Sequence, residues 1–423
     1  MTGLFRQILI SGVAVSFVLT ATIPALAQNA KANSQDYVCG DDECEAQPLS
    51  KETPGSGTQS LQGFLQNQPG FVSRPIDAFR SLLADDFSFD LFGHTFSAGI
   101  SGRATRAFLY GDNQDESELF FVDNNNSSTQ VVGVAELAFD ENSLIGGRVK
   151  LPIIFNSSVD ADFGDGGVDF SFGEFDEREL SGYLSHIAYG TFHFGYGSTA
   201  SDGTSETDLS GMTVISRSRV RDLAGGLSFS EGGPTIGDVF FNFDGLGDDN
   251  RFRYDAPRMA NFLFSTSLTR DGSFDVAARW EKRFDTKRVA AAASLVDRDD
   301  GVEQASLSLS ALWEDGFNIT GVISGQHRNE RDPFLIYAKI GWFAAPFEIG
   351  STAFGFDAAY NDSSKTDGDK AATIGAFVVQ TIDREGIVNG IDLYGGLRFH
   401  HYETEDESYD GILASMVGVR VRF

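Results

Sequence analysis

Apolar and polar side chains alternate along the chain from about Phe87 to its last residue. The final stretch shows this most clearly, with Phe423, Val421 and Val419 on one face and Arg422 on the other. A period of two is typical of a β-strand, because successive side chains leave opposite faces of the pleated backbone. The pattern therefore predicts an all-β chain that ends in a strand.

Sixteen segments carry this alternation. They are 95–110, 129–139, 144–155, 177–188, 191–197, 250–256, 261–270, 273–284, 287–295, 305–313, 318–326, 333–342, 347–360, 371–381, 387–400 and 409–423. Short turns alternate with longer acidic connections, as in outer-membrane barrels. We expect a closed transmembrane antiparallel β-barrel, since hydrocarbon offers no partner for the backbone of an open edge. A soluble β-sandwich shares the period, but the even strand number and unequal connections favour the barrel.

Three regions are expected along the chain. Residues 1–27 resemble a cleaved signal peptide, with Arg6 before an apolar run and a small-residue site ending at Ala27. Residues 28–85 are polar and predict a flexible periplasmic extension, or a tether or plug, with a short helix at 75–83. Residues 86–423 form the barrel domain. In the extension, Cys39 and Cys44 are spaced for a small disulfide, with a metal site as the weaker alternative.

Composition narrows the function. The formal net charge of −29 would repel a polyphosphate backbone and argues against a nucleic-acid partner. The sequence predicts no cofactor and no metal site. The histidines are scattered, and the adjacent His400 and His401, expected in the last outer loop, would point to opposite faces of a strand. An outer-membrane barrel enzyme is therefore the weaker alternative to a channel.

The longest connection follows the segment 191–197 and runs over 198–249. So long a connection is either functional or disordered. Its apolar positions would be poorly placed in water, so we expect them to pack inward against the barrel wall; they are Met212, Val214, Ile215, Leu223, Leu227, Phe229, Phe240 and Phe241.

Four stretches of the chain resemble the general porins of Gram-negative outer membranes. They are AYGTFHFGYGSTASDGTSETDLSG at 188–211, NRFRYDAPRMANF at 250–262, VDNNNSS at 122–128 and the terminal VGVRVRF. The resemblance implies a barrel of about sixteen strands, usually a homotrimer, in which the loop after the fifth strand folds into the lumen as a constriction. It also implies that the terminal Phe423 is a signal for the insertion machinery.

In that family, acidic residues of the loop face basic residues on the opposite wall. The matching acids here are Asp202, Glu206 and Asp208. The matching wall residues are Arg103, Arg148, Lys150, Arg251 and Arg253.

The expected function is passive diffusion of small hydrophilic solutes and ions through a water-filled channel in the cell outer membrane, with lipid and lipopolysaccharide as partners. A substrate-specific channel stays open as an alternative. In the barrel-closing strand, Phe423, Val421 and Val419 should face lipid, while Arg420 and Arg422 should face the lumen. A bulge or the membrane edge is expected at Arg106, which interrupts the alternation of its strand.

Overall fold

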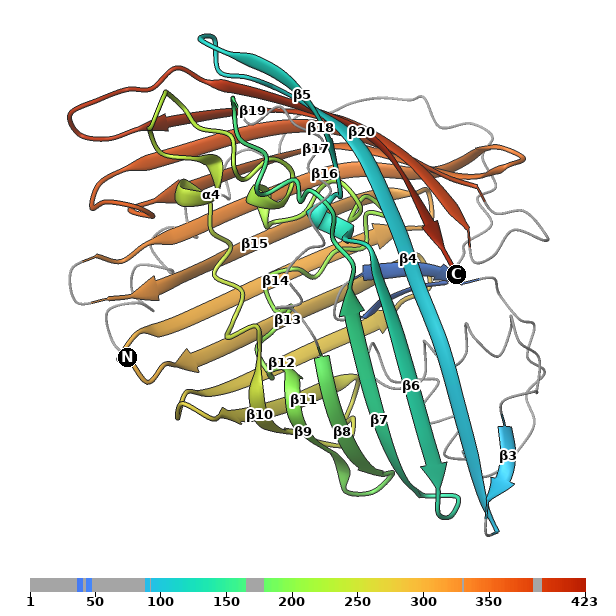
Figure 1. The fold of residues 1–423 in the computed structure, drawn as a ribbon. Helices are drawn as coiled ribbons and strands as arrows, with labels where there is room; N and C mark the ends of the chain where they lie inside the picture. The colour runs from blue at the N-terminus through green and yellow to red at the C-terminus, as the bar shows by residue number, and fades with distance from the viewer. Residues whose placement is uncertain are drawn as a thin grey trace.

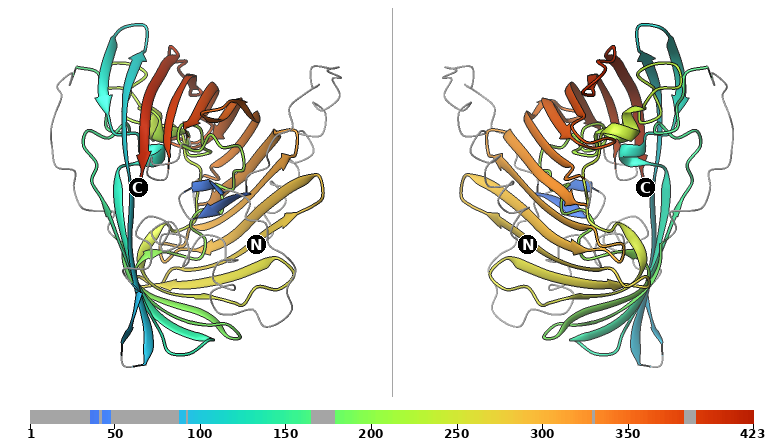
Figure 2. Two further views of the ribbon diagram at one scale, coloured as in Figure 1. Left: turned by 90° about the vertical axis from the view of Figure 1, so that its right-hand side faces the viewer. Right: turned by 90° about the vertical axis from the view of Figure 1, so that its left-hand side faces the viewer.

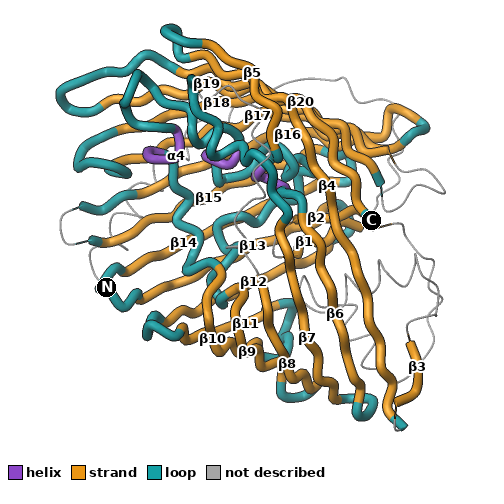
Figure 3. The backbone as a smooth tube through the Cα atoms, viewed as in Figure 1, coloured by secondary structure: helices purple, strands orange, loops and turns teal. Residues whose placement is uncertain are grey.

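A computed structural model describes residues 36–40, 43–47, 88–91, 93–164, 179–328, 331–382 and 390–423. Strands dominate it (Figures 1 and 3). They are β1 (Asp36–Gly40), β2 (Glu43–Gln47), β3 (Ser88–Leu91), β4 (His94–Asp112), β5 (Ser117–Val122), β6 (Gln130–Ala138), β7 (Ser143–Pro152), β8 (Glu179–His186), β9 (Gly190–Ser198), β10 (Asp248–Asp255), β11 (Phe262–Thr269), β12 (Phe274–Arg283), β13 (Lys287–Asp297), β14 (Glu303–Trp313), β15 (Phe317–His327), β16 (Phe334–Phe347), β17 (Gly350–Asp362), β18 (Lys370–Ile382), β19 (Ile391–Glu403) and β20 (Ile412–Arg422). Short helical turns lie at η2 (Asn125–Ser127), η4 (Val220–Asp222) and α4 (Ile236–Val239). No helix in these ranges is long and apolar enough to cross a membrane.

The strands β4 and β6 to β20 close into a sixteen-stranded antiparallel barrel. Each strand from β6 to β19 pairs with the next one in sequence, and β4 closes the ring by pairing with both β6 and β20. The sixteen alternating segments of the sequence correspond one by one to these strands. The predicted fold class is therefore confirmed, and the end positions differ by a few residues.

The barrel ends where the sequence expects it to close. The amide of Gly102 donates to the carbonyl of Phe423 at 2.7 Å, and the amide of Phe423 donates back at 2.9 Å. Val417 and Val421 are exposed on the outer face, whereas Met416 and Ala414 are fully buried on the inner one. The terminal strand thus leaves no unpaired edge, which an apolar surrounding would penalise.

The structure differs from two local expectations around β4. The residues of β5 lie between the expected strands 95–110 and 129–139, where the sequence predicts a longer connection without a strand. Instead they pair with residues 107–112 of β4, and β6 pairs with residues 95–103. The register between β4 and β20 runs unbroken from 103 to 112, so the bulge expected at Arg106 is wrong, whereas the membrane edge there stays a prediction. Arg106 instead marks the place where β4 changes partner, and its guanidinium binds the carboxylate of Asp123. Arg106 therefore lies on the outward face of β4 because it binds the buried Asp123, and the strand is regular at this position.

Along the strands that do not contact a buried apolar cluster, the alternation separates an apolar outer face from a small or polar inner face. On β14, Leu307 and Leu309 are about half exposed, while Ser306, Ser308 and Ser310 are buried. This arrangement is the reverse of that in a soluble sandwich, whose apolar face is the buried one. It indicates an outer surface made for hydrocarbon.

Residues 36–47 are the described part of the expected N-terminal extension. β1 and β2 pair as antiparallel strands, and their register places Cys39 opposite Cys44. This register is compatible with the expected disulfide, which stays a prediction. The expected signal peptide and the helix expected at 75–83 lie outside the described residues.

Candidate functional site: the inner segment and the charged wall

The connection between β9 and β10, residues 199–247, is here called the inner segment. It follows the fifth strand of the barrel and runs inside the ring of strands (Figure 2). Its backbone is bonded to inward-facing side chains: the amide of Leu209 donates to Ser310 at 2.9 Å, and Ser324 donates to the carbonyl of Asn242 at 2.6 Å. The segment is therefore attached to the inner wall along its length.

A row of hydroxyl groups on the inner faces of β11 and of β13 to β15 makes this attachment possible. The row consists of Ser267, Ser294, Ser306, Ser308, Ser310, Thr320 and Ser324. Buried irregular backbone needs hydrogen-bond partners outside itself. Serine is short enough to let the segment approach the wall, and its hydroxyl both donates and accepts. In this way Ala200 donates to Ser267 at 2.9 Å.

Apolar side chains fasten the middle of the inner segment. Of the residues predicted to pack inward, all are buried except Phe241, which packs against the same cluster from a half-buried position. We call this cluster the inner apolar core; it joins the segment to the inner faces of β4 and β15 to β20. Glycine makes room for it, because a Cβ at Gly341 or Gly355 would lie within 2.8 Å of the Met212 Cε.

Two buried ion pairs anchor the segment where it crosses β16 and β17. The Lys339 ammonium binds Asp208 at 2.5 Å and donates to the carbonyl of Ser216 at 2.6 Å. Asp357 accepts from Arg398 at 2.6 Å and from the Ser216 hydroxyl at 2.6 Å. Asp208, predicted as a constriction acid, is thus placed in a buried contact with β16. Charges withdrawn from water in this way depend on their partners.

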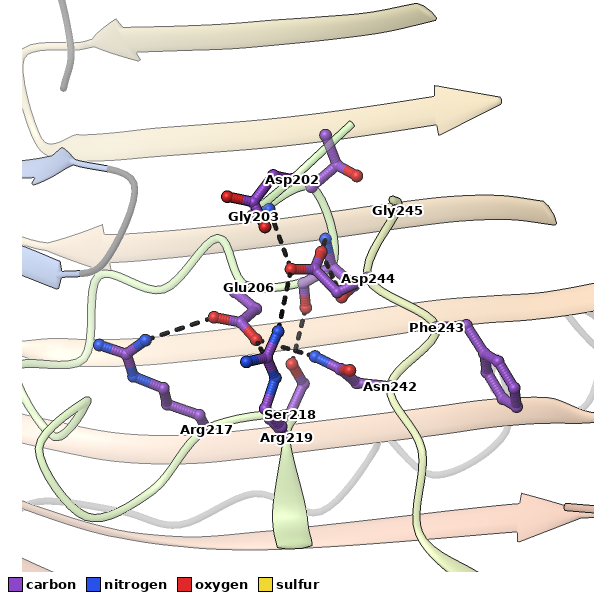
Figure 4. Close-up of polar contacts among 12 residues, drawn as sticks. Asp202, Gly203, Glu206, Arg217, Ser218, Arg219, Asn242, Phe243, Asp244 and Gly245 are labelled. Carbon is purple, nitrogen blue, oxygen red and sulfur yellow. Dashed lines mark hydrogen bonds and ion pairs between the residues drawn. The ribbon is translucent and has the colours of Figure 1, made fainter. Parts of the chain in front are cut away.

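A second ionic cluster lies on the inner segment itself (Figure 4). Glu206 accepts from Arg217 at 3.3 Å, Arg219 at 3.2 Å and Asn242 at 2.8 Å. Asp244 accepts from the amides of residues 203 and 205, so it ties the outgoing run to the returning run. The Arg219 side chain keeps 37% of its surface exposed and is the most open ionic group of this cluster.

Sequence reasoning missed the arginines of this cluster. The stretch SRSRVRD at 216–222 places Arg217 and Arg219 at alternate positions only ten or so residues after Glu206. That alternation was the available signal. The resemblance implies acids on the loop and bases on the wall, and it assigns no role to arginines on the loop.

Four of the predicted basic residues lie on the inner faces of β7 and β10, two strands that β8 and β9 separate in the barrel. We call the inner faces of β7 to β10 the charged wall. Arg148 pairs with Glu179 at 3.4 Å, and Lys150 pairs with Asp248 at 3.3 Å.

The arginines of β10 hold the start of the inner segment. Arg251 donates to the carbonyl of Ser198 at 2.9 Å, and Arg253 donates to that of Thr199 at 3.0 Å while pairing with Asp255 at 2.8 Å. From β12, Arg279 donates to the carbonyls of Ala200 and Asp202. These cations therefore position the segment, a role that the sequence analysis did not assign to them.

The remaining predicted residues lie elsewhere. Arg103 is on β4, separated from β7 by β6, and donates to the carbonyl of Ser128 at 2.9 Å. Arg420 and Arg422 face inward as expected and bind Asp392. The acids that balance the charged wall, Glu179 and Asp255, were missed because nothing in the local sequence marks their strand partners.

Burial shifts the pKa of two carboxyl groups on the inner segment. It raises the pKa of Asp222 to about 6, against the opposing effect of Arg219. It also raises the pKa of Asp244, to which the nearby charge of Glu206 adds. Both shifts follow from removing a carboxylate from water. The segment therefore holds a group that titrates just below neutral pH.

The expected histidine pair in the last outer loop is wrong, because both residues lie within β19. His400 is fully buried on the inner face, with its ring 5.3 Å from that of Phe240. His401 is on the opposite face, as the period of two requires. In the described part of the chain, no three His, Cys, Asp or Glu side chains gather to hold a metal ion.

These features define a class: a sixteen-stranded antiparallel barrel with an apolar outside, a polar and charged inside, and a segment docked on its inner wall. The solved anion-selective porin from Comamonas acidovorans has this fold, with a TM-score of 0.53, 14% identity, and coverage of 78% of this chain and 100% of that one. A loop-deletion mutant of OmpT, an outer membrane protein of Vibrio cholerae, has a TM-score of 0.50 at 10% identity, covering 78% and 99% of the two chains. No family model and no curated protein matches the sequence.

Proposed function

We propose that this chain is an outer-membrane porin that lets small hydrophilic solutes and ions diffuse passively through a water-filled channel. The observation that carries the proposal is the pairing of an apolar outer face with an inner face of charged, partly exposed side chains in a closed barrel. Barrels of this strand number enclose water rather than a packed core.

The two inner regions support a particular course for the water path. The inner apolar core covers the inner faces of β15 to β20 and of β4, which removes that side from water. On the other side, Arg148 and Lys150 of the charged wall keep 12% and 13% of their side chains exposed, and Arg219 keeps 37%. The proposed path runs between the charged wall and the cluster around Glu206.

Opposed charges across such a path would orient dipolar solutes and hinder apolar ones. Asp202 and Glu206 are the acids we assign to this constriction. Asp208 acts there indirectly, because its carboxylate holds Lys339. On the wall, Arg148 and Lys150 carry the proposed field, and Arg251 and Arg253 position the segment that narrows the path.

We extend the proposal to the cellular setting. A cleaved signal peptide at 1–27 would export the chain, and residues 28–85 would form a periplasmic extension. The apolar outer face would contact outer-membrane lipid and lipopolysaccharide, and the resemblance to general porins supports a homotrimer. Mass measurement of the detergent-solubilised protein by light scattering would test the trimer.

Single-channel conductance in a planar bilayer tests the function. Refolded protein should insert in discrete steps whose conductance rises in proportion to salt concentration, as in a water-filled pore. A correctly folded barrel that produces no steps would overturn the proposal. The folded state is established separately by the heat-dependent mobility of the barrel in a denaturing gel.

A substrate-specific channel is the second candidate. The observation that favours it is the extent of the inner apolar core, which leaves less of the barrel to water than a polar wall would. The conductance of a substrate-specific channel would be blocked by a particular solute in a saturable way. The conductance of a general pore would show no saturable block. Enzyme activity is the weakest alternative, since the buried His400 lies against Phe240 and away from solvent.

A further inference from the structure

Aromatic rings gather on the outer face of the barrel at the short-turn ends of β12 to β16. All three tryptophans of the chain lie there, Trp280 on β12, Trp313 on β14 and Trp342 on β16. Phe317 joins the last two, with ring centroids 5.3 Å from Trp313 and 4.9 Å from Trp342. On the neighbouring hairpin, the rings of Trp280 and Phe284 are 6.3 Å apart.

Two lysines lie among these rings. The Lys282 ammonium is 5.1 Å from the centroid of Phe284. The Lys287 ammonium is 5.9 Å from the same ring and 5.7 Å from that of Trp313, its cross-strand neighbour. We call these two lysines and the rings beside them, Trp280, Phe284, Trp313, Phe317 and Trp342, the lysine–tryptophan rim.

These two lysines differ from the other described lysines. Lys150, Lys339, Lys365 and Lys370 each lie within 3.5 Å of a carboxylate. Across the described ranges, Lys282 and Lys287 form no ion pair, although the chain contains 61 acidic residues. The turns nearby carry Asp285 and Glu314, but these residues lie beyond the strand ends. The rim therefore presents positive charge, without an internal counter-ion, beside rings suited to a membrane interface.

We propose that the lysine–tryptophan rim binds the phosphodiester headgroup of anionic phospholipid in the leaflet at the short-turn end of the barrel. The inference goes beyond the channel itself and rests only on the proposed membrane insertion. Long lysine side chains lie along apolar surface while their ammonium groups reach the headgroup level. Attraction to an anionic surface contributes about fivefold in affinity for each lysine near it. Two lysines on one hairpin thus select an anionic headgroup over a zwitterionic one.

Tryptophan fluorescence reports on this rim directly, because the chain has no tryptophan elsewhere. The folded protein is placed in vesicles of phosphatidylcholine that contain a fixed fraction of either brominated phosphatidylglycerol or brominated phosphatidylcholine. Bromine quenches a tryptophan that it contacts. We expect the anionic brominated lipid to quench tryptophan fluorescence more strongly than the zwitterionic one at equal mole fraction. Salt at about 0.5 M should remove this difference, because it shortens the Debye screening length to a few ångströms.

The variant Lys282→Gln/Lys287→Gln should lose the preference for phosphatidylglycerol, while total quenching at saturating brominated lipid stays the same. The matched control is Lys365→Gln/Lys370→Gln, which removes the same charge from residues that already pair with Asp238 and Glu403; it should retain the preference.

Equal quenching of the wild type by the two lipids would overturn the proposal, as would a preference that survives in the Lys282/Lys287 variant. If that variant does not fold, the salt measurement on wild-type protein tests the proposal, because a preference that persists at high salt would overturn it. Failure of the channel proposal is separate, since a barrel that inserts but does not conduct would still show the preference.

Discussion

The inner apolar core and the charged wall lie on opposite parts of one barrel and hold the inner segment in different ways. On the side of β15 to β20, burial of residues such as Met212 and Leu223 removes apolar surface from water, with buried ion pairs fixing the position. On the side of β7 to β10, arginines hold backbone carbonyls while their own charges pair with neighbouring acids. One side therefore holds the segment mainly through burial and the other mainly through charged contacts, which supports the proposed water path along the charged wall.

Breaking the buried pair between Lys339 and Asp208 should have the largest effect on this comparison. Lys339→Met leaves the Asp208 carboxylate buried without the lysine charge that balances it, at a cost of about 3 to 5 kcal/mol. Urea unfolding of the barrel in lipid measures that loss. The double variant Lys339→Met/Asp208→Asn should recover a large part of it. A single variant as stable as wild type would contradict the anchoring role.

Truncation in the inner apolar core should come next. Leu223 is 1% exposed, so Leu223→Ala should destabilise the docked segment by about 3 kcal/mol through lost burial and an unfilled cavity. Conductance noise in single-channel records should rise as the segment detaches. The control is Leu309→Ala on the outer face, where 48% of the side chain is exposed and no core is lost. Equal noise in both variants would show that the core does not hold the segment.

The pH dependence of stability sharpens the comparison further. Asp222 has a pKa of about 6 in the folded protein, above the ordinary value of about 4, so the folded state binds its proton more tightly than the unfolded state. Stability should be highest below about pH 4 for this group and fall by about 3 kcal/mol as the pH rises to 7. Asp244 contributes in the same direction.

The measurement is therefore the difference between wild type and Asp222→Asn in denaturant unfolding from pH 4 to 7. The variant should lose the part of the slope that belongs to Asp222. Parallel curves would show that Asp222 is not buried in a folded segment.

The smallest expected effect concerns selectivity. Glu206→Gln removes one negative charge beside Arg217 and Arg219, so the permeability ratio should shift toward anions by about threefold, the size of a weak charge interaction in partly exposed surroundings. The reversal potential in a salt gradient measures this shift. Asp299→Asn, in the connection after β13, serves as the charge-matched control, and an equal shift there would point to bulk charge rather than the constriction.

The strands could be predicted because their information is local. In 305–313 and 409–423, successive side chains face either lipid or the barrel interior, and this produces the alternation. The pattern can be recognised without knowing which strands are paired. The strand β5 could not be found in this way, because it is short and directly follows an acidic run before Ser117. It also pairs with residues 107–112 of β4, where a simple barrel would have β6 as the neighbouring strand.

The site was predictable only in part. Arg148, Lys150, Arg251 and Arg253 were correctly assigned to inner faces, since the period of two fixes the face of each residue. Their partners depend on which strands are neighbours and in which register, and the sequence contains no local record of either.

What the sequence by itself determined is the barrel: a long series of segments of period two, with apolar residues for lipid and a terminal strand ready to close the ring. Only the tertiary structure decided how the inside is used. It brought Asp208 to Lys339 across 131 positions of sequence and Glu206 to the arginines of its own segment. The physical reason is that periodicity arises from the chain's surroundings on either face, whereas the pairing of charges arises from the register and from the docking of one segment on a distant wall.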